Sequence, residues 1–225
     1  PVAGVKLPQK EEQRERVLSP DELRDLWQTF GEAGYPFGPM FKLSLLTAQR
    51  RGEVAEMRWR DLDLDNALWT IPETKNGKSQ EVPLSRQAVA LLREVPTWTR
   101  DDFVWSTTDG KAHVSGFSKA KLRVERDTNA RREKDGRAPM ENWRLHDLRR
   151  TAATGMAHIG VSVNVISRVL NHAQTSVTAV YDRHSYLGAK RQALQAWADA
   201  LDRVLAGKPM DAAGEGNVVK LAEVG

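Results

Sequence analysis

His146 and Arg149 stand three positions apart in the segment WRLHDLRRT. On a helix, residues at i and i+3 share a face, so the imidazole and the guanidinium would project toward one point. Such a pair suits a phosphate group, because guanidinium donors match its oxygens in geometry and in charge. His172 follows an apolar run, and Tyr181 lies nine residues further on. The stretch from Trp143 to Tyr181 is therefore the first candidate for a site that performs chemistry.

A second set of charged residues occurs earlier in the chain. Arg50 and Glu53 in TAQRRGE have the i, i+3 spacing of a helical ion pair, and Lys75 and Lys78 stand beside the turn sequence Asn76-Gly77. Both pairs also have a structural explanation. A helical Arg–Glu pair stabilises its own helix by about 0.2–0.5 kcal/mol, and lysines beside a turn keep it hydrated.

The later stretch is open to structural explanations too. His146 with its neighbours could form a surface pair with Asp147, as many exposed helical charges do. His172 could cap a helix, and Tyr181 could be one of three tyrosines at the edge of the core. Each explanation suffices for a single residue, whereas the joint pattern depends on how the chain places these residues.

Periodicity and capping signals predict a mainly α fold with one small antiparallel β-sheet. The sequence SPDE from Ser19 supplies an N-cap, a proline at the first helical position and a Glu that closes a capping box. From Asp61 the pattern changes to short strands with turns at Asp65-Asn66 and Asn76-Gly77. We expect helices at 19–33, 40–46, 85–95, 115–129, 146–159, 162–170 and 187–205, short helices at Arg50 and around Tyr181, an extended piece at 103–105 and a charged loop at 130–142.

Length and composition allow one large domain or two small ones, since the chain has 225 residues and 40% of them are hydrophobic. Residues 1–17 are polar without periodicity and 207–216 are rich in Gly, so we expect a linker at 1–17, a folded domain at 18–206 and a flexible tail at 207–225. The absence of cysteine excludes disulfides and thiolate metal sites. No apolar run approaches the roughly 18 residues of a membrane span, so we expect a cytoplasmic protein.

The charge balance favours a polyanionic partner without requiring one, because the net charge is +4 and the sequence pI is near 9.4. From Lys119 to Arg150 eleven Lys or Arg stand against six Asp or Glu, a local excess of five that exceeds that of the whole chain. A solvated helix and loop is the default explanation of such a run. With DNA as the partner, the candidate contacts are Lys78, Lys119, Lys121, Arg123, Arg144 and Arg150.

Across residues 19–186 the sequence resembles the tyrosine recombinase family of phage-type integrases. TAQRRGE at 47–53 looks like the family's first arginine motif, and TKNGK at 74–78 looks like its hairpin lysine. HDLRRT at 146–151 resembles its His-x-x-Arg box, and LNHAQTSVTAVY at 170–181 resembles the segment with its final His and nucleophilic Tyr. The sequence departs at Ala48, where the family usually has Gly, and at Asn171, where Gly commonly precedes the second His. Both departures concern local backbone shape rather than chemistry.

The resemblance implies the fold of a tyrosine recombinase catalytic domain at 18–206, preceded by a linker from a missing N-terminal DNA-binding domain. It also implies a catalytic set supported by the acid Glu53, with the members Arg50, Lys75, His146, Arg149, His172 and Tyr181. Physical chemistry agrees, because attack on a DNA phosphodiester builds negative charge. Arg50 and Arg149 can offer planar forks to the two non-bridging oxygens, and His172 adds a further donor.

Proton transfer accounts for the remaining members of the set. Tyr181, with an unperturbed pKa of about 10, is a weak nucleophile at neutral pH unless its proton is removed, and His146 is the candidate base. Lys75 at a hairpin tip would protonate the departing 5′ oxygen, with Lys78 as the substitute if the turn register shifts. No metal or other cofactor is expected, since arginine supplies the charge that a metal would otherwise provide.

These inferences favour a site-specific DNA recombinase, an integrase of a phage or integrated element, that works through a 3′-phosphotyrosyl intermediate. Its expected partner is double-stranded DNA, on which it would form a homotetramer, whereas the isolated domain would be a monomer. The protein would be associated with the bacterial nucleoid. Residues 217–222 of the tail would dock on a neighbouring protomer, or else form an ordinary terminus. Two alternatives stay open: a type IB topoisomerase, and a basic DNA-binding module without catalysis.

Overall fold

The structure, a computed structural model, describes residues 15–74, 77, 79–99, 101–172 and 185–211 of the 225. Its elements are α1 (Pro20–Ala33), α2 (Phe37–Thr47), α3 (Arg51–Ala55), the 3-10 helix η1 (Trp59–Asp61), β1 (Leu62–Asp63), β2 (Leu68–Ile71), β3 (Gln80–Pro83), α4 (Arg86–Arg93), α5 (Phe117–Lys134), α6 (Leu145–His158), α7 (Val163–Val169) and α8 (Ser185–Leu205). This confirms the predicted fold class, mainly α with a small antiparallel sheet. Within these ranges, none of the helices has the length and apolarity needed to span a membrane.

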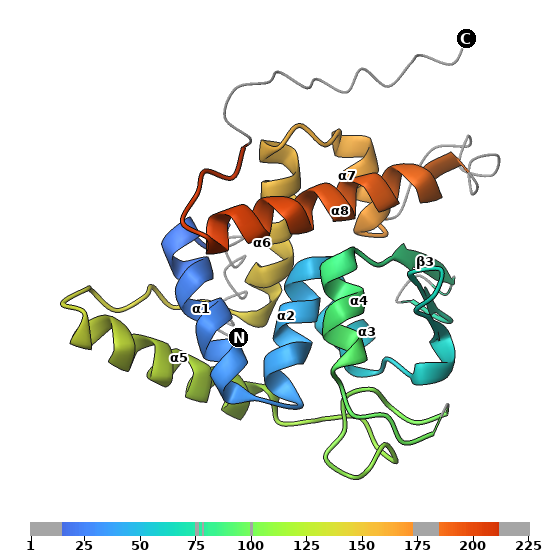
Figure 1. Ribbon diagram of the computed structural model, residues 1–225, viewed down its shortest axis with the longest axis horizontal. Helices are drawn as coiled ribbons and strands as arrows, with labels where there is room; N and C mark the ends of the chain where they lie inside the picture. The colour runs from blue at the N-terminus through green and yellow to red at the C-terminus, as the bar shows by residue number, and fades with distance from the viewer. Residues whose placement is uncertain (1–14, 75–76, 78, 100, 173–184, 212–225) are drawn as a thin grey trace, which may run out of the picture.

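Helix α8 joins the two halves of the chain. Helices α1, α2 and α4 run side by side through the centre of the molecule, with the sheet and α5 on opposite sides of them (Figure 1). Helix α8 packs on α1 and α2 from the first half, on α6 and α7 from the second, and on β3 of the sheet. It therefore holds the helices of the His146–His172 region against the two helices that precede Arg50.

A close approach between α6 and α8 depends on one glycine. A Cβ atom at Gly155 would lie 2.2 Å from the ring of Trp197, so a larger residue there would force the helices apart. The Trp197 indole is fully buried, and its Nε1–H donates to the carbonyl of Leu45 at 2.9 Å. Trp197 thereby ties α8 to α2 as well as to α6, which is consistent with the preference of a buried indole for a hydrogen-bond partner.

The sheet has the order β1-β2-β3 and is antiparallel throughout. Trp69 pairs with Leu62 on one side and with Val82 on the other. Trp69, Ile71 and Val82 are buried, because alternate residues of a strand face the core. Above β3, the Lys190 ammonium of α8 donates to the carbonyl of Glu81, so one edge of the sheet is fastened to α8.

The predicted helix starts at Ser19, Ser85 and Ser162 are confirmed. Each serine side chain accepts a hydrogen bond from the backbone N–H three residues later. At α1 the carboxylate of Glu22 also accepts from the Ser19 backbone N–H at 2.9 Å, which completes the expected capping box.

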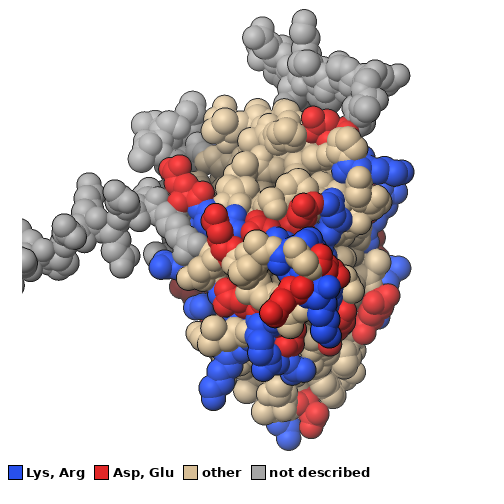
Figure 2. Space-filling view, turned by 90° about the vertical axis from the view of Figure 1, so that its left-hand side faces the viewer, with Lys and Arg blue, Asp and Glu red and all other residues tan. Residues whose placement is uncertain are grey.

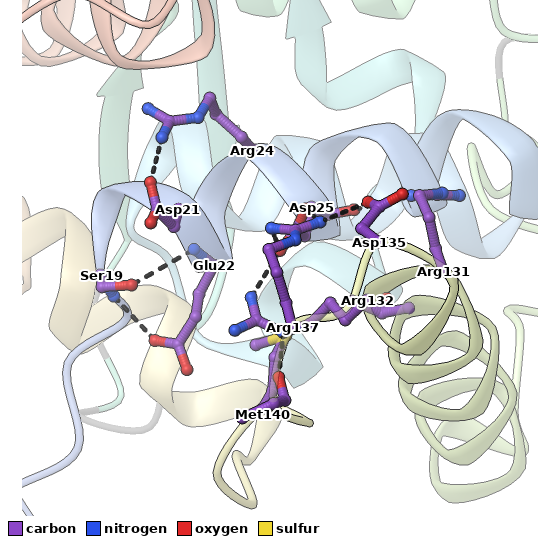
Figure 3. A network of polar contacts seen from close by, with 12 residues as sticks. Ser19, Asp21, Glu22, Arg24, Asp25, Arg131, Arg132, Asp135, Arg137 and Met140 are labelled. Carbon is purple, nitrogen blue, oxygen red and sulfur yellow. Dashed lines mark hydrogen bonds and ion pairs between the residues drawn. The ribbon is translucent and has the colours of Figure 1, made fainter.

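The expected charged loop at 130–142 is wrong in its first part. Helix α5 runs from Phe117 to Lys134, whereas the sequence predicted a helix from 115 to 129. Only Val124 and Thr128 of this helix are buried, so its last turn has no apolar face that periodicity could detect. The last turn is held instead by charged contacts with α1. Arg131 pairs with Glu32, and Arg132 pairs with Asp25 (Figure 3).

Asp25 is the centre of this polar network. Its carboxylate is 7% exposed and accepts from Arg132 at 2.6 Å and from both terminal nitrogens of Arg137 at 2.9 Å. Burial by itself would raise the pKa of Asp25, but the hydrogen bonds and charges of Arg137 and Arg132 bring it below its ordinary value. Figure 3 shows both arginines reaching from the end of α5 and the loop after it toward α1. The ion pairs therefore fix α5 and this loop to the central helices.

We predict that Asp25→Asn lowers the free energy of unfolding by about 1–3 kcal/mol at pH 7, because it removes the buried charged acceptor that Arg132 and Arg137 share. The control is Asp65→Asn, which removes an ion pair between Arg93 and a carboxylate that is 98% exposed, and should change stability by less than about 1 kcal/mol. Because the native pKa of Asp25 is depressed, its contribution is present above the unfolded pKa and is lost as pH falls through the native pKa. Urea titrations of both variants at pH 7 and pH 3 measure this, and equal losses at pH 7 would contradict it.

Candidate active site

Arg149 lies at the point where three separate parts of the chain meet. It is on α6, its side chain is buried, and its Nη1 donates to the carbonyl of Ala48 at 2.7 Å. Its Nη2 donates to the carbonyl of Leu170 at 2.5 Å. These bonds use one donor from each terminal nitrogen, so the guanidinium keeps further N–H groups for a ligand. Arg149 thus joins the end of α2 to the end of α7.

Both acceptor segments contain a residue with left-handed backbone. Ala48 ends α2 with a φ of 56°, and Asn171 follows Leu170 with a φ of 48°. These are the two positions at which the resemblance expects Gly. Asn visits this region more readily than other non-glycine residues, whereas Ala pays a cost of about 1–2 kcal/mol. The backbone shape that Gly would adopt is therefore present at both positions despite the substitutions.

Glu53 orients Arg50 at the start of α3. Its carboxylate accepts from the backbone N–H of Arg50 at 2.9 Å and from the Arg50 guanidinium at 2.8 Å. The Arg50 side chain is 26% exposed, whereas that of Glu53 is only 9% exposed. Glu53 thus fixes the position of Arg50 while part of the Arg50 side chain stays accessible. This arrangement is expected of a side chain that contacts a ligand.

The two histidines experience the charge of the arginines. Partial desolvation of the exposed His146 lowers its pKa, the charges of Arg150 and Arg149 lower it further, and Asp147 opposes them. Burial also lowers the pKa of His172, followed by the charges of Arg149 and Arg50. Both imidazoles are therefore neutral at pH 7. A neutral imidazole can accept a proton, as a base must.

The pKa of Arg149 is lowered to about 10, first by burial and then by the charge of Arg50, while Glu53 raises it. Arg149 therefore remains a cation at neutral pH. A small hollow beside it is lined by His146, Gln49 and Arg51 among others. The structure thus brings four of the predicted catalytic side chains, those of Arg50, His146, Arg149 and His172, into one electrostatic environment.

Lys75, Lys78 and Tyr181 lie outside the described residues. The described neighbours of Lys75 show that the predicted hairpin is present, because β2 and β3 pair and the N–H of Gly77 donates to the carbonyl of Thr74 at 2.8 Å. Tyr181 falls between His172 and the start of α8 at Ser185. The general acid and the nucleophile thus stay sequence-based predictions.

The predicted DNA contacts on and after α5 differ in accessibility. Lys121 is 13% exposed, pairs with Glu125 at 2.7 Å and lies over the Trp143 ring. Arg123 pairs with Asp127, and Arg150 pairs with Asp147.

Lys119 and Arg144 are exposed and have no ion-pair partner among the described residues. Figure 2, which views the side of the molecule where α5 lies, shows acidic and basic side chains interspersed. Most of the basic side chains between residues 119 and 150 are therefore in ion pairs.

Sequence reasoning missed three amide side chains that surround the end of α7. Gln49 and Gln80 are buried, and each donates from Nε2 to the carbonyl of Val169 at 3.0 Å. Asn171 donates from Nδ2 to the hydroxyl of Thr74 at 3.0 Å. The only signal in the sequence was the position of Gln49 and Asn171 next to motif residues. Among the described residues, no group of three or more His, Cys, Asp or Glu side chains could hold a metal ion.

We predict that His146 and His172 titrate below pH 6.5 in the DNA-free protein, which two-dimensional NMR of the imidazole nitrogens measures. Arg150→Gln should raise the pKa of His146 by removing a nearby positive charge and leave that of His172 unchanged, because Arg150 acts only on His146. Arg50→Gln should raise both pKa values. A wild-type His146 that titrates at or above pH 6.5 would contradict the described environment.

Comparison with known proteins gives relatives of one kind. Over 183 residues the chain is 33% identical to a shufflon-specific DNA recombinase of Escherichia coli, a match that covers 80% of this chain and 43% of that protein. The chain thus spans less than half of the length of this relative. Among solved structures, the integrase from mycobacterium phage Brujita aligns with a TM-score of 0.58 at 17% identity, over 85% of this chain and 61% of that chain.

A second solved structure has the same fold. The Tn1549 transposon integrase in complex with a circular intermediate DNA aligns with a TM-score of 0.61 at 15% identity, over 84% of this chain and 68% of that chain. The family model described as "Phage integrase family" matches residues 16–187, a range that contains every predicted catalytic residue. The chain therefore belongs to the phage integrase family.

Proposed function

We propose that this chain is the catalytic domain of a site-specific DNA recombinase that cleaves and rejoins DNA through a 3′-phosphotyrosyl intermediate. The observation that carries the proposal is that Arg50, Arg149, His146 and His172 share one electrostatic environment, in which Arg149 and His146 line a small hollow, beside hairpin and α7 segments that lead to Lys75 and Tyr181. The names of its relatives, a DNA recombinase and integrases, support the same class of reaction.

The two guanidinium groups bind the scissile phosphate. Arg149 is held by backbone carbonyls and Arg50 by a carboxylate, so neither has to be reoriented when charge builds on the non-bridging oxygens. Preorganised donors of this kind stabilise a transition state more than flexible ones, since the cost of ordering is already paid. His172, which is exposed beside them, adds a further donor to the phosphate.

Proton transfer then divides between two other side chains. His146 is neutral and exposed at the start of α6, so it accepts the proton of the Tyr181 hydroxyl as the oxygen attacks phosphorus. Lys75 donates a proton to the departing 5′ oxygen, with Lys78 as its substitute. The phosphotyrosyl bond retains the energy of the phosphoester, and a 5′ hydroxyl from another strand therefore reverses the step without ATP.

The wider assembly follows from this function. Double-stranded DNA is the partner, contacted first by the exposed Lys119 and Arg144 and then by Lys121, Arg123 and Arg150 if their ion pairs open. We assign residues 18–206 to the catalytic domain, 1–17 to a linker from an N-terminal DNA-binding domain and 207–225 to a tail whose residues 217–222 dock on a neighbouring protomer. The active form is a homotetramer on DNA at the bacterial nucleoid, and the isolated domain is a monomer.

A nicked suicide substrate tests the proposal. Wild-type protein should form a covalent protein–DNA adduct, visible as a slower band on a denaturing gel, whereas Tyr181→Phe should form none and still bind the same DNA in a mobility-shift assay. Arg149→Lys should reduce the rate of adduct formation by at least about a hundredfold, because Lys cannot replace a planar fork held by two carbonyls.

Two further DNA substrates distinguish the competing functions. Recombination between two intact sites identifies a recombinase, whereas relaxation of supercoiled DNA without strand exchange would identify a topoisomerase. Binding without any adduct in the wild-type protein would leave only a DNA-binding module and would overturn the proposal.

A further inference from the structure

Both legs of the β2–β3 hairpin are tethered to the end of α7. Gln80, the first residue of β3, donates from Nε2 to the carbonyl of Val169 at 3.0 Å. On the other leg, Thr74 accepts through its hydroxyl from the Asn171 amide, also at 3.0 Å. Thr74 is 5% exposed and Gln80 is 6% exposed, so neither contact is a loose surface contact. The hairpin is therefore fixed by side chains to a segment that is far away in sequence.

The same segment is also bound from the arginine side of the site. Gln49, the neighbour of Arg50, donates to the carbonyl of Val169, and Arg149 donates to that of Leu170. The backbone N–H of His172 donates to the carbonyl of Ser167 at 3.1 Å, which fixes the residue that follows Asn171. Residues 169–172 thus connect the two arginines to the hairpin, and Asn171 contacts Thr74, the residue directly before Lys75.

The backbone conformation of Asn171 and the contact made by its side chain can be considered separately. Its φ of 48° is left-handed, a conformation that Gly adopts without strain and Asn tolerates. Gly would therefore preserve the turn but could not reach Thr74. The amide adds a contact that backbone shape alone does not explain.

We propose that Asn171 is a positioning residue for leaving-group protonation. Its amide holds Thr74, the residue directly before Lys75, against the turn that carries His172. This inference rests on the proposed function. In the step concerned, the Tyr181 oxygen forms a bond to phosphorus and its proton passes to His146. The bond from phosphorus to the 5′ oxygen breaks, and the Lys75 ammonium gives its proton to that oxygen.

Leaving-group chemistry provides a readout that a general folding role would not change. An alkoxide is a strongly basic leaving group, because its alcohol, like water, is a very weak acid, and so it needs the proton. A thiol has a pKa of about 8.5, so a thiolate departs without one. A DNA substrate with sulfur in place of the bridging 5′ oxygen therefore no longer depends on the acid or on residues that position it.

The experiment uses full-length protein with nicked suicide substrates that carry either oxygen or sulfur at the bridging position. Asn171→Gly keeps the backbone and removes the amide, and Thr74→Val removes the hydroxyl. Thr74→Ser is the matched control, because it keeps the hydroxyl. Thermal unfolding of each variant confirms that it is folded before single-turnover rates of adduct formation are measured.

With the oxygen substrate, Asn171→Gly and Thr74→Val should each slow adduct formation by about three- to tenfold, the effect of one hydrogen bond. The double variant should be no slower than the slower single variant, and Thr74→Ser should stay within about twofold of wild type. With the sulfur substrate all variants should match wild type within about twofold.

Three results would overturn the inference. These are an equal loss of rate on both substrates, independent losses that multiply in the double variant, and wild-type rates for Asn171→Gly on the oxygen substrate. A wild-type protein that forms no adduct with either substrate would overturn the proposed function itself, and the two failures are thereby distinguished.

Discussion

The buried guanidinium of Arg149 is the interaction on which the rest of the site depends. Removing such a group from water costs on the order of several kcal/mol unless its donors find strong acceptors. Here the acceptors are the carbonyls of Ala48 and Leu170, each two residues before a predicted catalytic side chain, Arg50 or His172. One residue of α6 therefore sets the distance between two loops, and in the proposed function the same cation contributes charge to the phosphate site. Arg149 thus has a structural role and, in the proposed function, a chemical role as well.

In the proposed function, this arrangement requires a particular backbone shape at two positions. The carbonyl of Ala48 reaches Arg149 from a left-handed residue at the end of α2, and that of Leu170 does so just before left-handed Asn171. Neither position has Gly, so the chain bears conformational strain at Ala48 and uses Asn171 for an additional contact with Thr74. Residues that flank a motif can thus carry part of its geometry.

Sequence could predict the features that arise from local signals. The caps at Ser19, Ser85 and Ser162 are read within four residues, and the small sheet follows from alternation and turn residues. The His-x-x-Arg spacing likewise predicted that His146 and Arg149 share a helix. The length of α5 was not predictable, because its last turn is stabilised by Asp25 and Glu32, about a hundred residues earlier. The tethers from the three amides escape sequence reasoning for the same reason.

The most direct test of this account is the structure of full-length Tyr181→Phe protein bound to its DNA site. We predict that Arg50 and Arg149 both donate to non-bridging oxygens of one phosphate at about 2.7–2.9 Å, while Arg149 keeps its bonds to Ala48 and Leu170. A scissile phosphate that contacts neither guanidinium, or an Arg149 that leaves both carbonyls in order to bind DNA, would contradict the claim that one buried cation both builds and serves the site.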